Sequence, residues 1–152
     1  MDSLIIFGAK YLIFIVCIIF VIFFLTTKKR KRVQFILYTI TLGLSAFVVS
    51  RIASFLYDNP RPFISDGVVP LINYGIDNGF VSDHTLLAGA LAAVITIFNW
   101  RLGVFMWVLA VVIGISRVFA GVHHYIDIAG SLFITGFLCF IFFKFLNLRK
   151  HF

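Results

Sequence analysis

Long runs of apolar residues, separated by short polar segments, dominate the chain. They lie at residues 4–27, 33–57, 85–98, 102–119 and 125–146. A helix needs roughly 20 mainly apolar residues to cross a bilayer, whereas the strands of a membrane β-barrel alternate in polarity. Because these runs are continuous, the pattern predicts an all-α polytopic membrane protein, a compact bundle of about five transmembrane helices with one long outer loop.

Composition agrees with a membrane protein. Hydrophobic residues make up 62% of the 152 residues and charged residues 12%, compared with about 45–50% and about 25% in soluble domains. Helices and short loops account for the whole chain, so residues 1–152 are expected to form one membrane-embedded domain. The net charge of +7 then favours anionic lipid headgroups as partners over nucleic acid. Cys17 and Cys139 lie in apolar runs and are expected to act as small buried hydrophobes.

The distribution of positive charge predicts an orientation. A basic cluster at residues 28–32 follows the first apolar run, whereas a cleavable signal peptide carries its charge before that run. The first run is therefore expected to be a retained helix. The positive-inside rule places the cluster and the carboxyl terminus in the cytoplasm, and the amino terminus and long loop outside. The cytoplasmic side of this cell-membrane protein then also receives Arg101, Lys144, Arg149 and Lys150.

Polar residues gather at the expected outer ends of the helices. The long loop at residues 58–81 contains all three prolines, and loops of this length are usually functional or disordered. Ionisable groups within membrane spans are costly and usually mark function. The residues at this level are Arg51, Arg61, Ser82, Asp83, His84, Ser116, Arg117, His123, His124 and Asp127.

Several of these residues suit phosphate chemistry. Arg61 and Arg117 offer planar forks of donors that match phosphate oxygens, although Arg61 alone would equally suit a simple loop cation. His123 and Asp127 are four residues apart, so on a helix they share a face. A carboxylate bonded to one imidazole nitrogen leaves the other as nucleophile or base, or the pair only ties two helices together.

The start of the third apolar run adds two candidates. His84 is able to protonate a leaving oxygen, and Ser82 faces a helix start that favours anions or is simply an N-cap. The sequence has no carboxylate cluster suited to Mg²⁺, and adjacent histidines are too close for a usual zinc pair. Phosphoryl transfer without a metal or other cofactor is therefore expected.

These residues resemble the signatures of the type 2 phosphatidic acid phosphatase superfamily of membrane lipid phosphatases. The third signature, Ser-Arg-x5-His-x3-Asp, is matched in full at residues 116–127. The second is similar at Val81-Ser82-Asp83-His84, and the first only at Arg61-Pro62. The Ser-Asp-His form resembles the bacitracin-resistance-type undecaprenyl diphosphatases. The resemblance spans residues 51–130.

The resemblance implies a phosphohistidine mechanism. His123 would attack phosphorus, Asp127 would orient it, and His84 would protonate the leaving group. Arg61, Arg117 and Ser82 would hold phosphate oxygens, and Asp83 and Ser116 within the motifs are further candidates for substrate binding. Ser54 occupies the position of the family's first-signature lysine. Arg51, one helical turn earlier, is expected to replace that lysine, or else to pair with Asp58 or lie among the headgroups.

The resemblance implies an integral-membrane hydrolase. The leading interpretation is hydrolysis of undecaprenyl diphosphate to the monophosphate at the outer face, with substrate drawn from the bilayer. A phosphatase of phosphatidic acid or phosphatidylglycerol phosphate, and a phosphotransferase between lipids, remain as alternatives. The missing lysine leaves room for a catalytically impaired relative that binds lipid.

Overall fold

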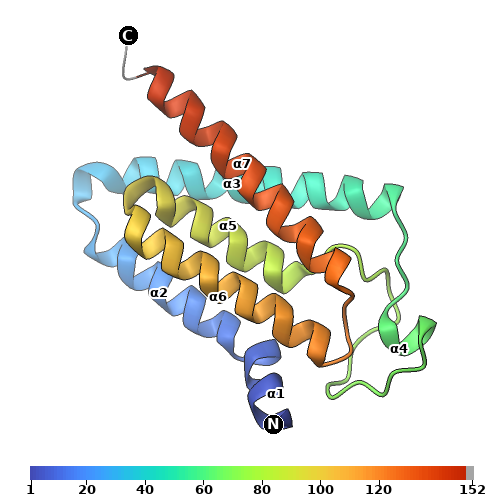
Figure 1. Ribbon diagram of the computed structural model, residues 1–152. Coiled ribbons are helices and arrows are strands. Elements are labelled where there is room, and N and C mark those ends of the chain that lie inside the picture. The colour runs from blue at the N-terminus through green and yellow to red at the C-terminus, as the bar shows by residue number, and fades with distance from the viewer. Residues whose placement is uncertain (150–152) are drawn as a thin grey trace.

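Helices form all the regular structure in the part of the chain that is described. The computed structural model describes residues 1–149, and side chains as far as residue 145. Figure 1 shows a bundle of long helices with an irregular loop at one end. The all-α membrane bundle expected from the sequence is confirmed. The helices are α1 (Asp2–Lys10), α2 (Leu12–Thr26), α3 (Lys29–Leu56), α4 (Pro62–Ser65), α5 (Asp83–Phe98), α6 (Trp100–Phe119) and α7 (Tyr125–Arg149).

The helices differ in how well their lengths suit a membrane crossing. Among the described residues, α3, α6 and residues Tyr125–Phe145 of α7 are long and apolar enough to span a bilayer. The first apolar run is not one straight helix, because α1 and α2 meet at a bend of 42°. The two helices are long enough to form a fourth span only when they are taken together. At this bend Arg117 Nη1 donates to Ala9 O at 3.1 Å. A side chain that bonds a helix carbonyl interrupts the ladder there, which explains the break.

The third expected apolar run, residues 85–98, forms α5, a short central helix. Its 16 residues extend about 24 Å, less than the hydrocarbon core of about 30 Å. Buried positions include Ala88, Ala92 and Ala93, and a Cβ added at Gly89 would lie 2.5 Å from Thr135 Oγ1. Small residues therefore let α6 and α7 approach this helix closely.

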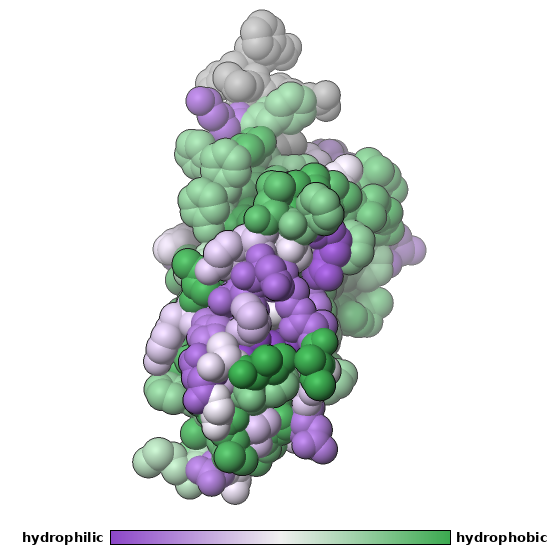
Figure 2. Space-filling model, turned by 90° about the vertical axis from the view of Figure 1, so that its right-hand side faces the viewer, coloured by the Kyte–Doolittle hydropathy of each residue, from purple (hydrophilic) through white to green (hydrophobic). Residues whose placement is uncertain are grey.

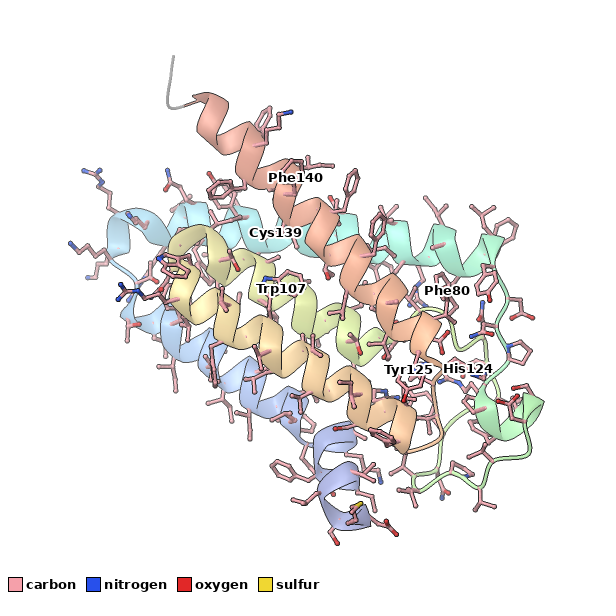
Figure 3. All side chains as sticks on the ribbon, viewed as in Figure 1. Phe80, Trp107, His124, Tyr125, Cys139 and Phe140 are labelled. Carbon is pink, nitrogen blue, oxygen red and sulfur yellow. The ribbon has the colours of Figure 1, made fainter. Side chains whose placement is uncertain are left out.

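The two cysteines are half-buried and pack against the main hydrophobic core. Figure 3 shows Cys139 on α7, at a distance from the loop end where His124 lies. This placement agrees with the apolar packing role expected from the sequence.

The long loop closes one end of the bundle. In Figure 1, α3 extends further than α5 at this end of the bundle, and the loop that contains α4 lies beyond the first residues of α5. Leu71 N donates to Ala120 O at 3.0 Å, which fastens the loop to the turn between α6 and α7. Gly121 allows that turn, because its φ is +74° and a Cβ there would lie 3.0 Å from Val68. The loop and the α6–α7 turn thus form one surface over the start of α5.

Candidate active site

Four charged or ionisable side chains meet beneath the long loop. Arg61 immediately precedes α4, Arg117 lies in the last turn of α6, His123 lies in the α6–α7 turn, and Asp127 lies in the first turn of α7. All four are at least 97% buried, with exposed fractions of 3%, 1%, 1% and 0%. Such burial is unusual for charged groups and requires specific partners. Figure 2, which faces this end of the molecule, shows hydrophilic residues gathered in the centre with apolar residues around them.

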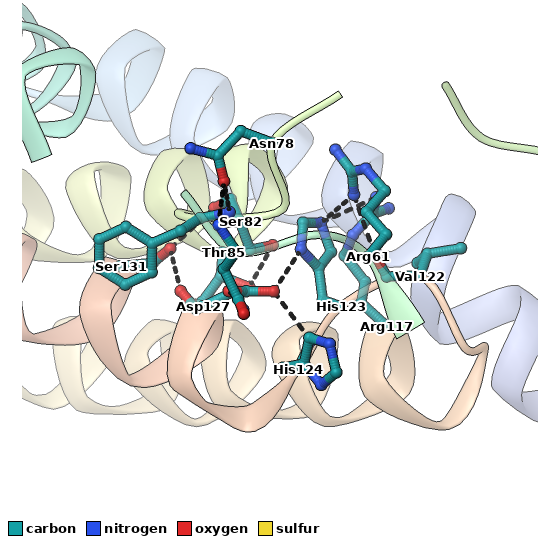
Figure 4. Close-up of polar contacts among 12 residues, drawn as sticks. Arg61, Asn78, Ser82, Thr85, Arg117, Val122, His123, His124, Asp127 and Ser131 are labelled. Carbon is teal, nitrogen blue, oxygen red and sulfur yellow. Dashed lines mark hydrogen bonds and ion pairs between the residues drawn. The ribbon is translucent and has the colours of Figure 1, made fainter. Parts of the chain in front are cut away.

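His123 is the centre of this group. Its Nδ1 lies 3.2 Å from Asp127 Oδ2, and its Nε2 lies 3.3 Å from Arg61 Nη1 and 3.4 Å from Arg117 Nη2. An ionised carboxylate only accepts hydrogen bonds, so Nδ1 must be the donor and Nε2 carries the lone pair. Figure 4 shows the imidazole between the carboxylate on one side and the two guanidinium groups on the other. The nitrogen with the free lone pair therefore faces the positive charges.

Burial keeps this imidazole neutral. Desolvation lowers the pKa of His123 below its ordinary value of 6.5, and the neighbouring Arg117 and Arg61 lower it further, against the opposing bond to Asp127. Removal from water disfavours the charged form of a histidine. A neutral His123 is the form that provides a nucleophilic nitrogen.

Asp127 is held by more than His123. Asn59 Nδ2 donates to its Oδ1 at 2.7 Å, and the backbone N–H of His124 donates to its Oδ2 at 2.8 Å. Gly79 permits this close packing, because a Cβ there would lie 2.9 Å from Asn59 O and 3.2 Å from Asp127 Oδ2. Sequence analysis did not identify Asn59, which lies in an irregular loop without periodicity. Its position next to Pro60 and Arg61, within the first signature, was the one available signal.

The two arginines are positioned by the loop and by α1. Arg61 Nε donates to Asp77 Oδ1 at 2.9 Å and its Nη1 donates to Val122 O at 2.9 Å. The ring of Tyr74 lies 4.3 Å from the Arg61 guanidinium and 4.7 Å from that of Arg117. These cation–π contacts hold both guanidinium groups near one ring. No pattern in the sequence had indicated Tyr74 or Asp77.

One donor in this group has no protein acceptor. Among the described residues, Arg117 Nε is the one buried side-chain nitrogen or oxygen without a hydrogen-bond partner. A buried unsatisfied donor is costly and calls for an explanation. An anion bound between the arginines would accept from such a donor. The arrangement therefore suits a phosphate group opposite His123 Nε2.

The start of α5 lies next to this centre, where Ser82 N donates to Asp127 O at 3.3 Å. Ser82 is at the N-cap position but makes no side-chain capping bond; its hydroxyl accepts from Thr85 Oγ1 at 3.1 Å. Ser131 Oγ donates to Ser82 O at 2.9 Å, which ties the segment to α7. His84 is half-buried, and its burial, with the neighbouring Arg117 and His123, lowers its pKa from 6.5 to about 4. Ser82 and His84 are thus brought towards the other candidates.

Other candidates lie away from the centre. Ser116 Oγ donates to Val112 O at 2.8 Å within α6, and a Cβ on Gly8 would lie 2.2 Å from that oxygen. The structure therefore places this hydroxyl against α1 and not among the arginines. His124 Nε2 lies 3.1 Å from Pro60 O, and Figure 4 shows its ring apart from that of His123.

Arg51 also lies outside the buried group. It forms an ion pair with Asp83, not with Asp58, and both side chains of the pair are exposed. Ser54, at the position of the family's lysine, donates from its hydroxyl to Phe80 O. That position therefore supports the loop.

The described residues contain no group of three or more His, Cys or Asp side chains placed to hold a metal ion. The positive charge expected at Lys150 lies outside the described residues. Lys28 to Arg32 lie at the turn between α2 and α3. In Figure 1 this turn is at the opposite end of the bundle from the α4 loop.

Comparison with known proteins gives consistent matches. The profile of the PAP2 superfamily matches residues 34–151. The chain is 31% identical to undecaprenyl-diphosphatase BcrC of Bacillus subtilis (strain 168), over 100% of this chain and 78% of that protein. It is also 31% identical to the bacitracin transport permease protein BcrC of Bacillus licheniformis, over 86% of this chain and 64% of that protein. The crystal structure of a transmembrane PAP2 type phosphatidylglycerolphosphate phosphatase from Bacillus subtilis has the same fold, with a TM-score of 0.58 and 23% identity over 97% of this chain and 74% of that one.

Proposed function

This chain belongs to the PAP2 superfamily, and we propose that it removes the terminal phosphate of a polyprenyl diphosphate through a phosphohistidine intermediate. The observation that carries this proposal is the geometry of His123. Its Nδ1 is bonded to Asp127, and its Nε2 lies within 3.4 Å of two buried guanidinium groups. This arrangement joins a nucleophile to the positive charge that a phosphate requires.

The reaction proceeds in two steps. His123 Nε2 attacks the terminal phosphorus, the bond from phosphorus to the bridging oxygen breaks, and its electron pair stays with the lipid monophosphate. The pKa of His84 is about 4 in the free protein, and the negative charge of the bound diphosphate raises it, so that His84 holds the proton that it gives to that oxygen. Water then attacks the phosphohistidine, His84 takes a proton from it, and inorganic phosphate leaves. Asp127 stabilises the positive charge that develops on the imidazole, and Arg61 and Arg117 stabilise the phosphoryl oxygens. No metal ion takes part in the proposed reaction.

The substrate assignment rests on the relatives and on the position of the site. BcrC of Bacillus subtilis is named an undecaprenyl-diphosphatase. This chain, which is similar to it, contains Ser82-Asp83-His84 at the start of α5. The site lies at one end of a bundle in which α3, α6 and α7 are long and apolar enough to cross a membrane. A lipid keeps its tail in the bilayer while its headgroup reaches such a site. Retention of the complete His123–Asp127 and arginine arrangement argues against an impaired lipid-binding relative.

The arrangement of charges supports an outer location for the site. The basic turn at Lys28 to Arg32 and Arg101 at the start of α6 lie at the end of the bundle opposite the α4 loop. By the positive-inside rule that end faces the cytoplasm. We therefore place the amino terminus and the site at the outer face, in a multi-pass protein of the cell membrane.

Phosphate release by the purified protein in detergent tests the proposal. The panel contains undecaprenyl diphosphate, phosphatidic acid and phosphatidylglycerol phosphate, each assayed with and without EDTA. The proposal predicts highest kcat/KM for the diphosphate, no effect of EDTA, and loss of release in His123→Ala. A higher kcat/KM for either glycerolipid would replace the substrate assignment, and inhibition by EDTA would refute the metal-free mechanism.

A further inference from the structure

An exposed ion pair lies beside the candidate active site without belonging to the buried group. Arg51 on α3 and Asp83, the first residue of α5, form this pair, with exposed fractions of 46% and 61%. The Arg51 guanidinium also lies 5.4 Å from the centre of the Phe47 ring. Exposed ion pairs contribute little to folding stability. Stabilising the contact between α3 and α5 therefore does not by itself account for the pair.

The pair stands at the site end of an apolar groove between α3 and α5. The groove has a volume of about 430 Å³, within the range of about 300–1,000 Å³ common for small-ligand sites. Gly43, Ala46 and Ala90 line it with small side chains, and Phe47 and Leu87 are partly exposed along it. A Cβ on Gly43 would meet no atom within 4 Å, so the groove is open there. Arg51 and Asp83 are its charged lining residues.

We propose that Arg51 binds the lipid-proximal phosphate of a diphosphate substrate, exchanging Asp83 for that phosphate. This inference rests on the proposed function. Asp83 is adjacent in sequence to His84, on which Arg117 and His123 act electrostatically. Arg51 and Asp83 line the groove at the end where α5 begins, and at that end Ser82 N donates to Asp127 O at 3.3 Å. Arg51 therefore lies between the groove and the buried group. A prenyl chain in the groove brings its first phosphate beside Arg51 and its terminal phosphate to His123.

Such a contact distinguishes diphosphates from monophosphates. When the bond from the terminal phosphorus to the bridging oxygen breaks, negative charge accumulates on the lipid-proximal phosphate, which is the leaving group. A guanidinium fork bonded to its oxygens stabilises that charge. A lipid phosphomonoester has no second phosphate, and its leaving group is a single alcohol oxygen. Arg51 is thus a specificity-determining residue, whereas Arg61 and Arg117 serve any phosphoryl group.

Two measurements on one sample test this assignment. The first is kcat/KM for farnesyl diphosphate, and the second is the inhibition constant of orthovanadate, which probes the buried arginine group alone. We expect Arg51→Gln to lower kcat/KM by roughly 10- to 100-fold, as for a lost hydrogen bond to a charged group, with little change in the vanadate constant. Asp83→Asn, which removes the competing carboxylate, is expected to lower KM for the diphosphate. Arg101→Gln is the matched control, because Arg101 stacks on Trp100 at the opposite end of the bundle.

Other outcomes overturn the assignment. An unchanged kcat/KM in Arg51→Gln would show that Arg51 does not contact the substrate. A vanadate constant that rises in proportion to the loss of kcat/KM would show a structural effect on the whole site. If Arg51→Gln loses all activity and Arg51→Lys does not restore any of it, the effect would likewise be a structural one on the whole site. Absence of hydrolysis of both farnesyl diphosphate and undecaprenyl diphosphate by the unaltered protein would instead refute the proposed function itself.

Discussion

Asn59→Ala tests whether the orientation of Asp127 matters for catalysis. Asn59 Nδ2 donates to Asp127 Oδ1 at 2.7 Å, and the carboxylate is fully buried. The backbone of Asn59 makes separate bonds, from its N–H to Asn78 Oδ1 and from Gly79 N–H to its carbonyl. Alanine retains both backbone bonds. The substitution therefore removes one side-chain donor from the carboxylate that aligns His123.

The expected loss follows from the charge on Asp127. A hydrogen bond to a charged group contributes about 1.5–3 kcal/mol, and a buried acceptor has no water to replace it. Asp127 keeps its bonds from His123 and the His124 backbone, so the carboxylate stays in place but turns more freely. Each 1.4 kcal/mol lost from the transition state is a factor of about ten. We expect kcat/KM to fall by about tenfold or more, with a decrease in the free energy of unfolding of about 1.5–3 kcal/mol.

The assay compares steady-state phosphate release from farnesyl diphosphate with thermal unfolding in the same detergent. Asn73→Ala is the control, because Asn73 is exposed in the same loop and should leave both quantities unchanged. A kcat/KM for Asn59→Ala within twofold of the unaltered protein would refute the reasoning that Asn59 positions Asp127.

Three further predictions follow from the same structure. Since burial lowers the pKa of His123 below 6.5 and the neutral form is the nucleophile, the acid-side decline of kcat/KM should have its midpoint below pH 6.5; an acid-side midpoint at or above 6.5 would contradict this. Gly114→Ala should lower the free energy of unfolding by about 1–3 kcal/mol, because its Cβ would lie 2.3 Å from Ile128 Cγ2. Gly136→Ala is the control and should leave the free energy of unfolding unchanged, because its Cβ would meet no atom within 4 Å. Equal unfolding temperatures for the two variants would count against the close packing of α6 on α7. A reporter in the 66–78 loop should be outside the cell and one fused after Phe152 in the cytoplasm; cytoplasmic labelling of the loop would reverse the orientation.

Sequence reasoning was most successful where the physics is local. Continuous apolar runs predicted the helices. The spacing of His123 and Asp127 predicted that they share a helix face; the two side chains are in contact at 3.2 Å, but His123 lies in the turn before α7 and not on the helix. The bend between α1 and α2 was not predicted, because no proline marks Tyr11 and the bond that interrupts the helix comes from distant Arg117. The shortness of α5 was visible in its run of apolar residues, but its central position depends on packing against several helices.

The partners of the site residues were harder to predict. Asn59 and Tyr74 reach the site from an irregular loop, where no periodicity indicates which side chains point inward. Asp58 is near Arg51 in sequence, but the fold brings Asp83 to it instead. Ser116 matches its motif, yet the rotation of α6 directs its hydroxyl to Val112 O and α1. Such choices are decided by tertiary structure, which one sequence does not reveal.

Trapping of the phosphorylated enzyme tests the central claim most directly. The protein is mixed with farnesyl diphosphate labelled with ³²P in its terminal phosphate, quenched rapidly in alkali, and the labelled residue is located by peptide mapping. The account predicts an alkali-stable, acid-labile label on His123, absent in His123→Ala and present in His124→Ala, because His124 Nε2 contacts Pro60 O instead of the arginines. A label on another residue, or turnover by His123→Ala at the rate of the unaltered protein, would contradict it.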